Sequence, residues 1–216
     1  MGDLKTPIAM LAILFASIFL HGCGETARTA DKNITFSSGE NEAVVVLSLR
    51  TNSPDQSITS MFWREFDKTS SFFKDGKSQS IRVRRNSTLM WTRTESPLQE
   101  TRFLVHRVVP GNYALDYHYS GYIGENYTFK LRPTTLAFKV EAGEVIYLGN
   151  YLLKSPRGKA TFRGKEVDIF KADKTKLESD GQDIDPVKAF LRQEYPGIST
   201  FVVLRRPELA ELKLTR

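Results

Sequence analysis

The sequence predicts a mainly β protein, an antiparallel β-sandwich with one short C-terminal helix. Short segments rich in Val, Leu, Ile, Phe and Tyr recur at near-regular spacing, and turns that contain Gly or Pro separate them. One segment near the C-terminus has apolar residues at helical spacing. At 216 residues the chain is long enough for one domain with a real hydrophobic core. We find no internal repeat, and we place the sandwich domain at residues 43–204.

The first three strands are predicted between residues 43 and 85. Residues 43–49 form a dense run of Val and Leu, which suits a strand in the core. Polar and apolar residues alternate partly over 58–66 and cleanly over 80–85. An Asp-Gly pair at 75–76 marks the turn between these two strands.

The remaining β structure is predicted between residues 103 and 170. A Pro-Gly-Asn turn separates a strand at 103–109 from a strand at 113–119, and an Ala-Gly-Glu turn precedes the long apolar strand at 145–153. The other strands of this region are predicted at 127–131, 136–140, 160–162 and 167–170.

One helix is predicted at about 186–195. Asp185 is placed to act as its N-cap and Pro186 as its first residue, and a Pro-Gly pair ends the apolar stripe that follows. The acid-rich residues 173–185 are expected to form a solvated linker. We expect a last strand at 200–204, and a charged tail or short helix at 205–216.

The N-terminus predicts an exported, lipid-modified protein. Residues 8–20 form an apolar run that is too short to span a bilayer comfortably and has signal-peptide proportions. The next residues, Leu20-His-Gly-Cys23, resemble the lipobox of bacterial lipoprotein precursors. The resemblance implies a signal peptide at 1–22, cleavage between Gly22 and Cys23, and a membrane anchor of acyl chains, such as palmitate, on Cys23.

The region after Cys23 is expected to connect this anchor to the domain. Cys23 is the sole cysteine, so no internal disulfide can form. Residues 24–42 are polar and poor in large hydrophobic side chains, and they predict a flexible tether. Because Gly24 is not the aspartate that retains many lipoproteins in the inner membrane, we expect outer-membrane attachment facing the periplasm in a two-membrane bacterium. The alternative is an ordinary secretory signal followed by an unmodified cysteine.

Two phrases within the strand region carry a second resemblance. The first is Val109-Pro-Gly-Asn-Tyr-Ala-Leu115, and the second is Phe138-Lys-Val-Glu-Ala-Gly-Glu-Val-Ile-Tyr-Leu-Gly149. They resemble the small prealbumin-like β-sandwich modules that uncharacterised bacterial lipoproteins often contain. The resemblance covers about residues 103–153. It implies a fold and does not imply a particular function.

The sequence favours a protein that is not an enzyme. The mature chain keeps His106 and His118 but lacks the spacing of a zinc site, a GxSxG elbow and a phosphate-binding loop. Asp116 and His118 are expected on one face of the strand at 113–119, which permits a hydrogen-bonded pair or two metal ligands. The sequence indicates no third residue that would complete a catalytic or metal-binding group with Asp116 and His118. A polar sheet face is therefore the favoured interpretation, and we expect no metal and no cofactor.

A group of tyrosines is the first candidate for a binding surface. Strict alternation predicts that Tyr113, Tyr117 and Tyr119 share one strand face, and Tyr122 follows closely. Their rings could stack against a sugar. Tyrosines at alternating strand positions are, however, more often part of the core and its rim.

Three arginines in the strand at 80–85 are the second candidate. Arg82, Arg84 and Arg85 belong to a segment, 77–107, in which cations outnumber acids. Such a strand face is usually just solvated, but on a tethered protein it could also contact anionic lipid headgroups.

The net charge of +6 favours anionic partners such as lipid headgroups or polyanionic wall polymers. Nucleic acid is not expected, because no compact Lys/Arg run with interleaved aromatic residues occurs. The leading hypothesis is therefore a lipid-anchored cell-envelope protein that acts as a non-catalytic interaction or structural module, with an envelope protein or a wall glycan as partner. A module that binds a glycan or small ligand through the Tyr-rich hairpin at 113–129 is the alternative, and a hydrolase is a remote one.

Overall fold

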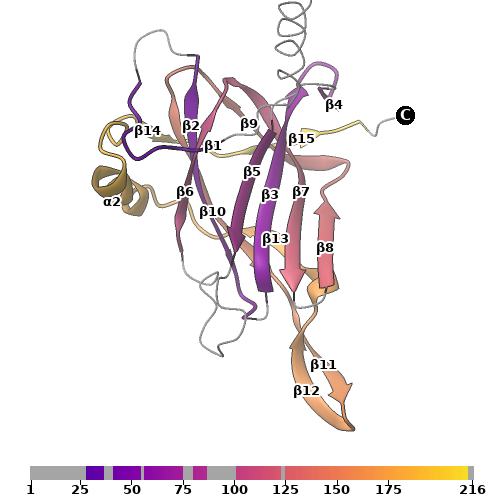
Figure 1. Cartoon of the computed structure of the whole chain (residues 1–216). Coiled ribbons are helices and arrows are strands. Elements are labelled where there is room, and N and C mark those ends of the chain that lie inside the picture. The colour runs from indigo at the N-terminus through magenta and orange to yellow at the C-terminus, as the bar shows by residue number, and fades with distance from the viewer. Residues whose placement is uncertain are drawn as a thin grey trace, which may run out of the picture.

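The computed structural model describes residues 28–36, 41–54, 56–74, 80–86, 101–122 and 125–213. This part of the chain is mainly β, with two sheets packed face to face and a single α-helix, α2 (Asp185–Glu194), which confirms the expected fold class (Figure 1). The predicted signal segment with Gly22 and Cys23, the Asp-Gly turn at 75–76 and residues 214–216 lie outside the described residues.

The first sheet contains six strands in the described part of the chain. They pair in the order β1 (Arg28–Thr29), β6 (Phe103–Val108), β2 (Ala43–Thr51), β10 (Val145–Lys154) and β13 (Lys176–Ser179), and β14 (Val202–Leu204) also pairs with β10.

Two pairs in this sheet are parallel, whereas the sequence predicted an antiparallel sandwich. β10 runs parallel to β2, with Val145 opposite Val44, and it also runs parallel to β14. Parallel strands covered on both faces have nearly continuous apolar sequences instead of alternating ones. The apolar runs in β2 and β10 have this character, and nearly every residue of β2 is buried.

The second sheet contains seven strands among the described residues. They are β15 (Glu208–Glu211), β9 (Thr134–Val140), β7 (Gly111–Tyr122), β3 (Gln56–Asp67) and β4 (Phe72–Phe73) in order, with β5 (Ser80–Asn86) added beside β3 and β8 (Glu125–Lys130) added beside β7. We call the end of the sandwich where β7 and β10 begin the upper end and the end where they finish the lower end, as oriented in Figure 1.

The main core fills the space between the two sheets. It contains fully buried Leu47, Trp63, Leu115 and Ile146, and the Trp63 ring meets the edge of Phe138 at 5.0 Å between centroids. Burial of such side chains stabilises each by about 1.5–3 kcal/mol relative to exposure.

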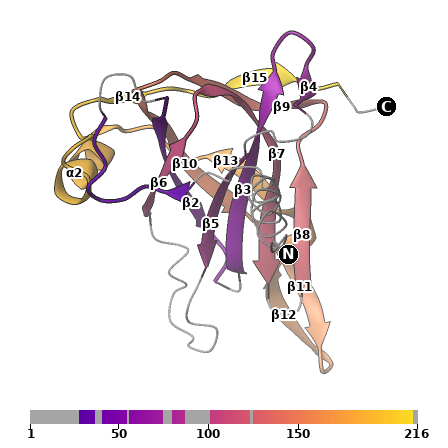
Figure 2. The same cartoon turned by 45° about the horizontal axis from the view of Figure 1, so that its top comes forward.

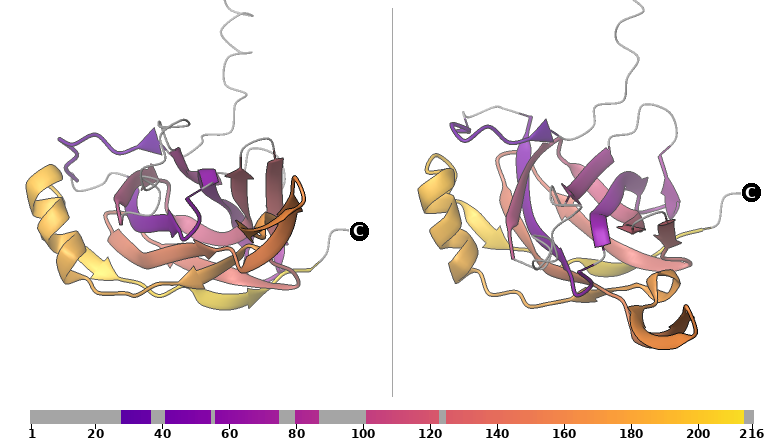
Figure 3. Two further views of the ribbon diagram at one scale, coloured as in Figure 1. Left: turned by 90° about the horizontal axis from the view of Figure 1, so that it is seen from below. Right: turned by 60° about the horizontal axis from the view of Figure 1, so that its bottom comes forward.

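A second core lies on the outer face of the first sheet. Helix α2 presents Val187 and Leu191 to Val44, Val46 and their neighbours on that face, so β2 has apolar contacts on both sides. Figure 3 shows α2 at one side of the sandwich, seen from below and obliquely. The helix begins one residue before the predicted start. Its N-cap position is Ile184, and Asp185 lies within the first turn.

Residues 28–36 belong to this second core, although the sequence predicted that residues 24–42 form a flexible tether. β1 pairs with β6, and the side chains of Ala30 and Ile34 are buried in the cluster around α2. The Ile34 carbonyl lies so close to Gly197 that a Cβ on that glycine would sit 2.5 Å from the Ile34 oxygen. The composition of the segment alone is too polar to order it, but the sheet and the helix supply the other half of an apolar cluster.

The C-terminal third is also more ordered than the sequence predicted. The expected linker at 173–185 contains β13, which pairs with β10 in the first sheet, and Asp180 just after β13 forms an ion pair with Arg50 of β2. The expected tail contains β15, which pairs with β9, and Leu212 after it is buried. Both segments were misjudged because edge strands need few apolar residues when their backbone pairs with an existing sheet.

One hairpin stands apart from the sandwich. β11 (Arg157–Phe162) and β12 (Lys165–Phe170) pair only with each other in the described part of the chain and form a separate two-stranded sheet. This hairpin continues downward from the end of β10 and projects beyond the lower end of the sandwich (Figures 1 and 2).

Candidate ligand-binding groove

A shallow groove lies on the outer face of the second sheet, in its lower half. It has a volume of about 300 Å³ and crosses four neighbouring strands. Its lining residues are Ile58 and Ser60 of β3, Arg82 and Arg84 of β5, Tyr117 and Tyr119 of β7, and Thr128 of β8. We call this site the outer groove.

The strand register explains why these side chains meet. On the central strand β3, Phe62 is opposite both Arg82 and Tyr117, and Ser60 is the next residue on the same face. Residues that pair directly across neighbouring strands point to the same side of the sheet. The arginines and the tyrosines predicted separately as two surfaces are therefore parts of one surface.

A β-bulge decides which tyrosines reach the outer groove. Phe62 pairs with Tyr117 and Trp63 pairs with Leu115, so Asp116 has no partner residue on β3. The extra residue reverses the side to which the following side chains point. The predicted single tyrosine face is therefore wrong, because Tyr113 faces the main core whereas Tyr117 and Tyr119 face outward.

At the edge of the outer groove, aromatic rings stack on each other and a guanidinium group lies over one of them. The rings of Phe62 and Tyr117 stack at 4.9 Å between centroids, with 29° between their planes. The Arg82 guanidinium lies 5.5 Å from the centroid of the Phe62 ring and 3.4 Å from the Tyr117 hydroxyl oxygen. A cation over an aromatic face contributes about 0.5–1 kcal/mol at an exposed site.

The chemistry of the outer groove suits an anionic ligand with a flat face. No lining residue among those described carries a carboxylate, while two carry guanidinium groups. Guanidinium groups donate paired hydrogen bonds to carboxylate, phosphate or sulfate groups. The half-buried rings of Tyr117 and Tyr119 offer stacking area, and the Ser60 and Thr128 hydroxyls can donate or accept hydrogen bonds.

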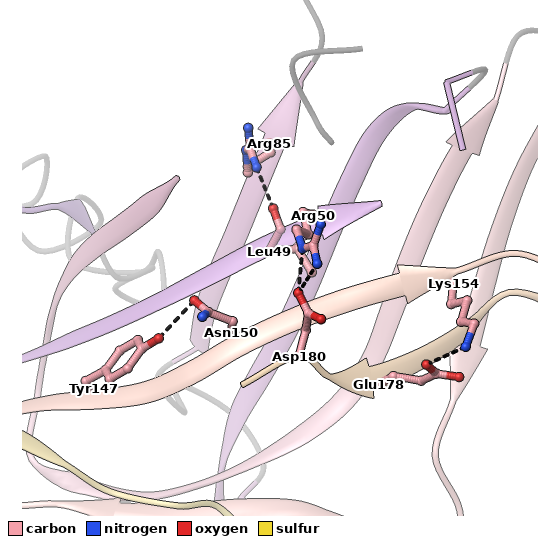
Figure 4. A network of polar contacts seen from close by, with 8 residues as sticks. All are labelled: Leu49, Arg50, Arg85, Tyr147, Asn150, Lys154, Glu178 and Asp180. Atoms are coloured by element: carbon pink, nitrogen blue, oxygen red, sulfur yellow. Dashed lines mark hydrogen bonds and ion pairs between the residues drawn. The ribbon is translucent and has the colours of Figure 1, made fainter. Parts of the chain in front are cut away.

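Three of the predicted surface residues lie elsewhere. Tyr113 is buried and donates its hydroxyl to the Val109 carbonyl at 2.7 Å, and burial raises the pKa of this phenol well above its usual value. Tyr122 contacts the Thr175 hydroxyl at 3.4 Å. Arg85 points to the interior and donates to the Leu49 carbonyl at 2.7 Å (Figure 4). Neither Arg85 nor Tyr113 can contact an external ligand in this arrangement.

The structure separates Asp116 from His118. Asp116 at the bulge accepts a hydrogen bond from Arg132 at 2.8 Å and lies 3.5 Å from Arg64. His118 points inward and stacks on Phe129 at 4.8 Å. The expected shared face is therefore wrong, and the pair does not form the hydrogen bond that regular alternation would permit.

The two histidines lie in different parts of the interior. His106 is on β6, where it pairs with Val45 and Thr29 across the first sheet, and His118 is on β7 of the second sheet. Both are buried, and burial lowers the pKa of each imidazole to about 4. In the described residues, the Nδ1 atoms of both rings lack a hydrogen-bond partner. Both imidazoles are therefore neutral at pH 7.

Sequence reasoning missed Phe62, Ile58, Ser60 and Thr128 as neighbours of the outer groove. Alternation along β3 puts the Phe62 side chain on the face of the strand opposite to that of the buried Met61 and Trp63. This alternation is the signal that could have identified Phe62 as an outward-facing residue. The predicted turn at 75–76 joins the segments of β3 and β5, but the pairing of β3 with β7 could not be read, because β4, β5 and β6 come between them in the sequence.

Comparison with known proteins adds no family to these observations. A scan against models of protein families finds no match, and a search of curated proteins finds none either. Within the described ranges, no helix is long and apolar enough to cross a membrane, and no group of three or more His, Cys, Asp or Glu side chains could hold a metal ion.

Proposed function

We propose that this chain is a lipid-anchored, non-catalytic envelope module that recognises an anionic ligand in the outer groove. The observation that carries this proposal is the meeting of Arg82, Arg84, Tyr117 and Tyr119 on one sheet face. Acylated Cys23 is the proposed anchor, and the lipobox resemblance at Leu20–Cys23 supports it.

An anionic glycan is the ligand class that the outer groove favours. A pyranose ring can stack on the Tyr117 ring, and an acidic substituent can pair with Arg82 beside it. A volume of about 300 Å³ is at the small end of ligand sites, which suits one or two sugar units of a longer chain. The described lining residues include no carboxylate, imidazole or thiol that could act as a general base for the Ser60 and Thr128 hydroxyls, and this composition supports a binding role.

The anchor is tested by intact mass. Protein extracted from membranes should have a mass that begins at Cys23 and includes acyl chains, and Cys23→Ser should lack both the cleavage and the added mass. A wild-type mass without acyl chains would contradict the proposed anchor but would not bear on the proposed ligand site in the outer groove.

The outer groove is tested by titration with an oligomer of a uronic acid. Arg82→Ala and Tyr117→Ala should each weaken binding about tenfold, because each removes about 1–1.5 kcal/mol of ionic or stacking interaction. Binding should also weaken as salt rises. A neutral oligomer of the same length should bind more weakly to the wild type than the acidic one.

Arg157→Ala provides a matched control for the groove variants. Arg157 lies over the Phe170 ring at 5.7 Å, so this change removes a similar cation and aromatic pair outside the groove. Its affinity for the acidic oligomer should equal that of the wild type. If the control and the two groove variants bind alike, the outer groove is not the binding site.

A further inference from the structure

In the described part of the chain, the hairpin β11–β12 belongs to neither sheet of the sandwich. Its two strands pair only with each other in the described part of the chain, and most of its side chains are exposed. An isolated two-stranded hairpin has only marginal stability in water. A projecting hairpin of this kind therefore gains stability if its exposed face contacts something else.

The hairpin has an apolar face and a charged face. The side chains of two residues that pair directly across the hairpin point to the same face. The register pairs Ala160 with Val167 and Gly158 with Ile169 on the apolar face. Phe162 and Lys165 complete that face at the tip. The opposite face contains Lys159, Asp168, Thr161 and Glu166, with the Lys159 ammonium 3.3 Å from Glu166 and 3.1 Å from Asp168.

The apolar face is uncovered at the tip, where cations gather. Phe162 is 62% exposed and Val167 is 37% exposed. The turn between the strands consists of Arg163 and Gly164, with φ of 51° and 75°. The Arg163 guanidinium lies 5.3 Å from the centroid of the Phe162 ring. From Arg157 to Lys171 the hairpin has five cations and two acids, and both acids are on the charged face.

We propose that the hairpin tip inserts into the surface of an anionic lipid bilayer, with Phe162 and Val167 at the level of the acyl chains and Arg163 and Lys165 among the headgroup phosphates. An aromatic residue flanked by cations, with acids kept to the other side, is the pattern that binds at such interfaces. A protein interface typically buries about 800 Å² on each partner with 20–30 residues, and this face offers only about six. The bilayer is therefore favoured over a folded protein partner.

Tryptophan quenching by brominated lipid tests this proposal. The full chain with Phe162→Trp is reconstituted in vesicles that contain phosphatidylglycerol and phosphatidylcholine with brominated acyl chains. Thr161→Trp is the matched control, because Thr161 is the adjacent residue on the charged face. The wild type supplies the background from Trp63, which is buried, and from Trp91.

The added tryptophan of Phe162→Trp should be quenched at least about twofold more than that of Thr161→Trp, with emission shifted to the blue. The difference should vanish in vesicles of phosphatidylcholine alone, and also when Arg163→Glu and Lys165→Glu are added. Equal quenching at both positions overturns the assigned face. A tryptophan at position 162 that is not quenched overturns bilayer insertion. The readout is independent of ligand binding in the outer groove and of the mass that tests Cys23.

Discussion

The free energy of unfolding is expected to fall by up to about 6 kcal/mol as the pH is lowered from 6.5 to 4. His106 and His118 have a pKa of about 4 in the folded protein, where burial disfavours their charged form, against 6.5 in the unfolded chain. Between these two values the unfolded state binds more protons, so stability decreases as the pH falls. Each histidine contributes about 3 kcal/mol at most, which is a large part of the 5–15 kcal/mol typical of a domain.

Urea unfolding at a series of pH values measures this loss as the slope of the free energy of unfolding against pH. His106→Gln and His118→Gln should each remove about half of the histidine contribution to the slope between pH 6.5 and 4, whatever they do to stability at pH 7. The double variant should retain only the slope due to carboxylates. If wild type and double variant have the same slope, the histidines are not the groups that make the fold sensitive to acid.

Tyr113→Ala should lower the free energy of unfolding by about 3–5 kcal/mol, while Tyr117→Ala lowers it by about 1 kcal/mol. Tyr113 is buried, stacks on Phe138 at 5.5 Å and donates to the Val109 carbonyl, so its removal leaves a cavity and breaks this hydrogen bond. Tyr117 lies on the outer face and loses mainly its stacking on Phe62.

The comparison of these two variants tests the bulge at Asp116, because the two tyrosines belong to the same strand and are four residues apart. Regular alternation would place them on one face and predict similar costs. Thermal or urea unfolding of both variants under one condition decides between the two arrangements. Equal losses would contradict the reversal of faces, and Tyr113→Phe should cost much less than Tyr113→Ala because it keeps the ring.

The strands of the sandwich could be predicted because their signal is local. Val/Leu runs, alternation and Gly turns placed β2, β3, β5 and β7 to within a few residues. Strand direction could not be predicted, because the parallel contact of β2 with β10 joins segments about 100 residues apart. The same limit applies to the outer groove. Arg82 and Tyr117 were singled out for their residue types, and only the register across β3 places them together.

The bulge and the N-terminal segment were missed for different reasons. One unpaired residue, Asp116, leaves no trace in hydrophobic alternation until the partner strand is known. Residues 28–36 contain few apolar side chains, and their order comes from the complementary cluster around α2, which a window along the chain cannot detect. In both cases tertiary contacts decide what local composition leaves open.

The docking of residues 28–36 has a mechanical consequence for a chain held by Cys23. Only residues 24–27 then separate the proposed anchor from β1, and the five steps from Cys23 to Arg28 span at most about 17–18 Å even when fully extended. β1 pairs near the upper end of the sandwich, and the hairpin projects from the lower end. A rigid body fixed near one end can still pivot and spin. With a second contact at the far end it can rotate only about the line that joins the two points. The short connection to Cys23 and the hairpin contact would therefore together restrict the direction in which the outer groove faces.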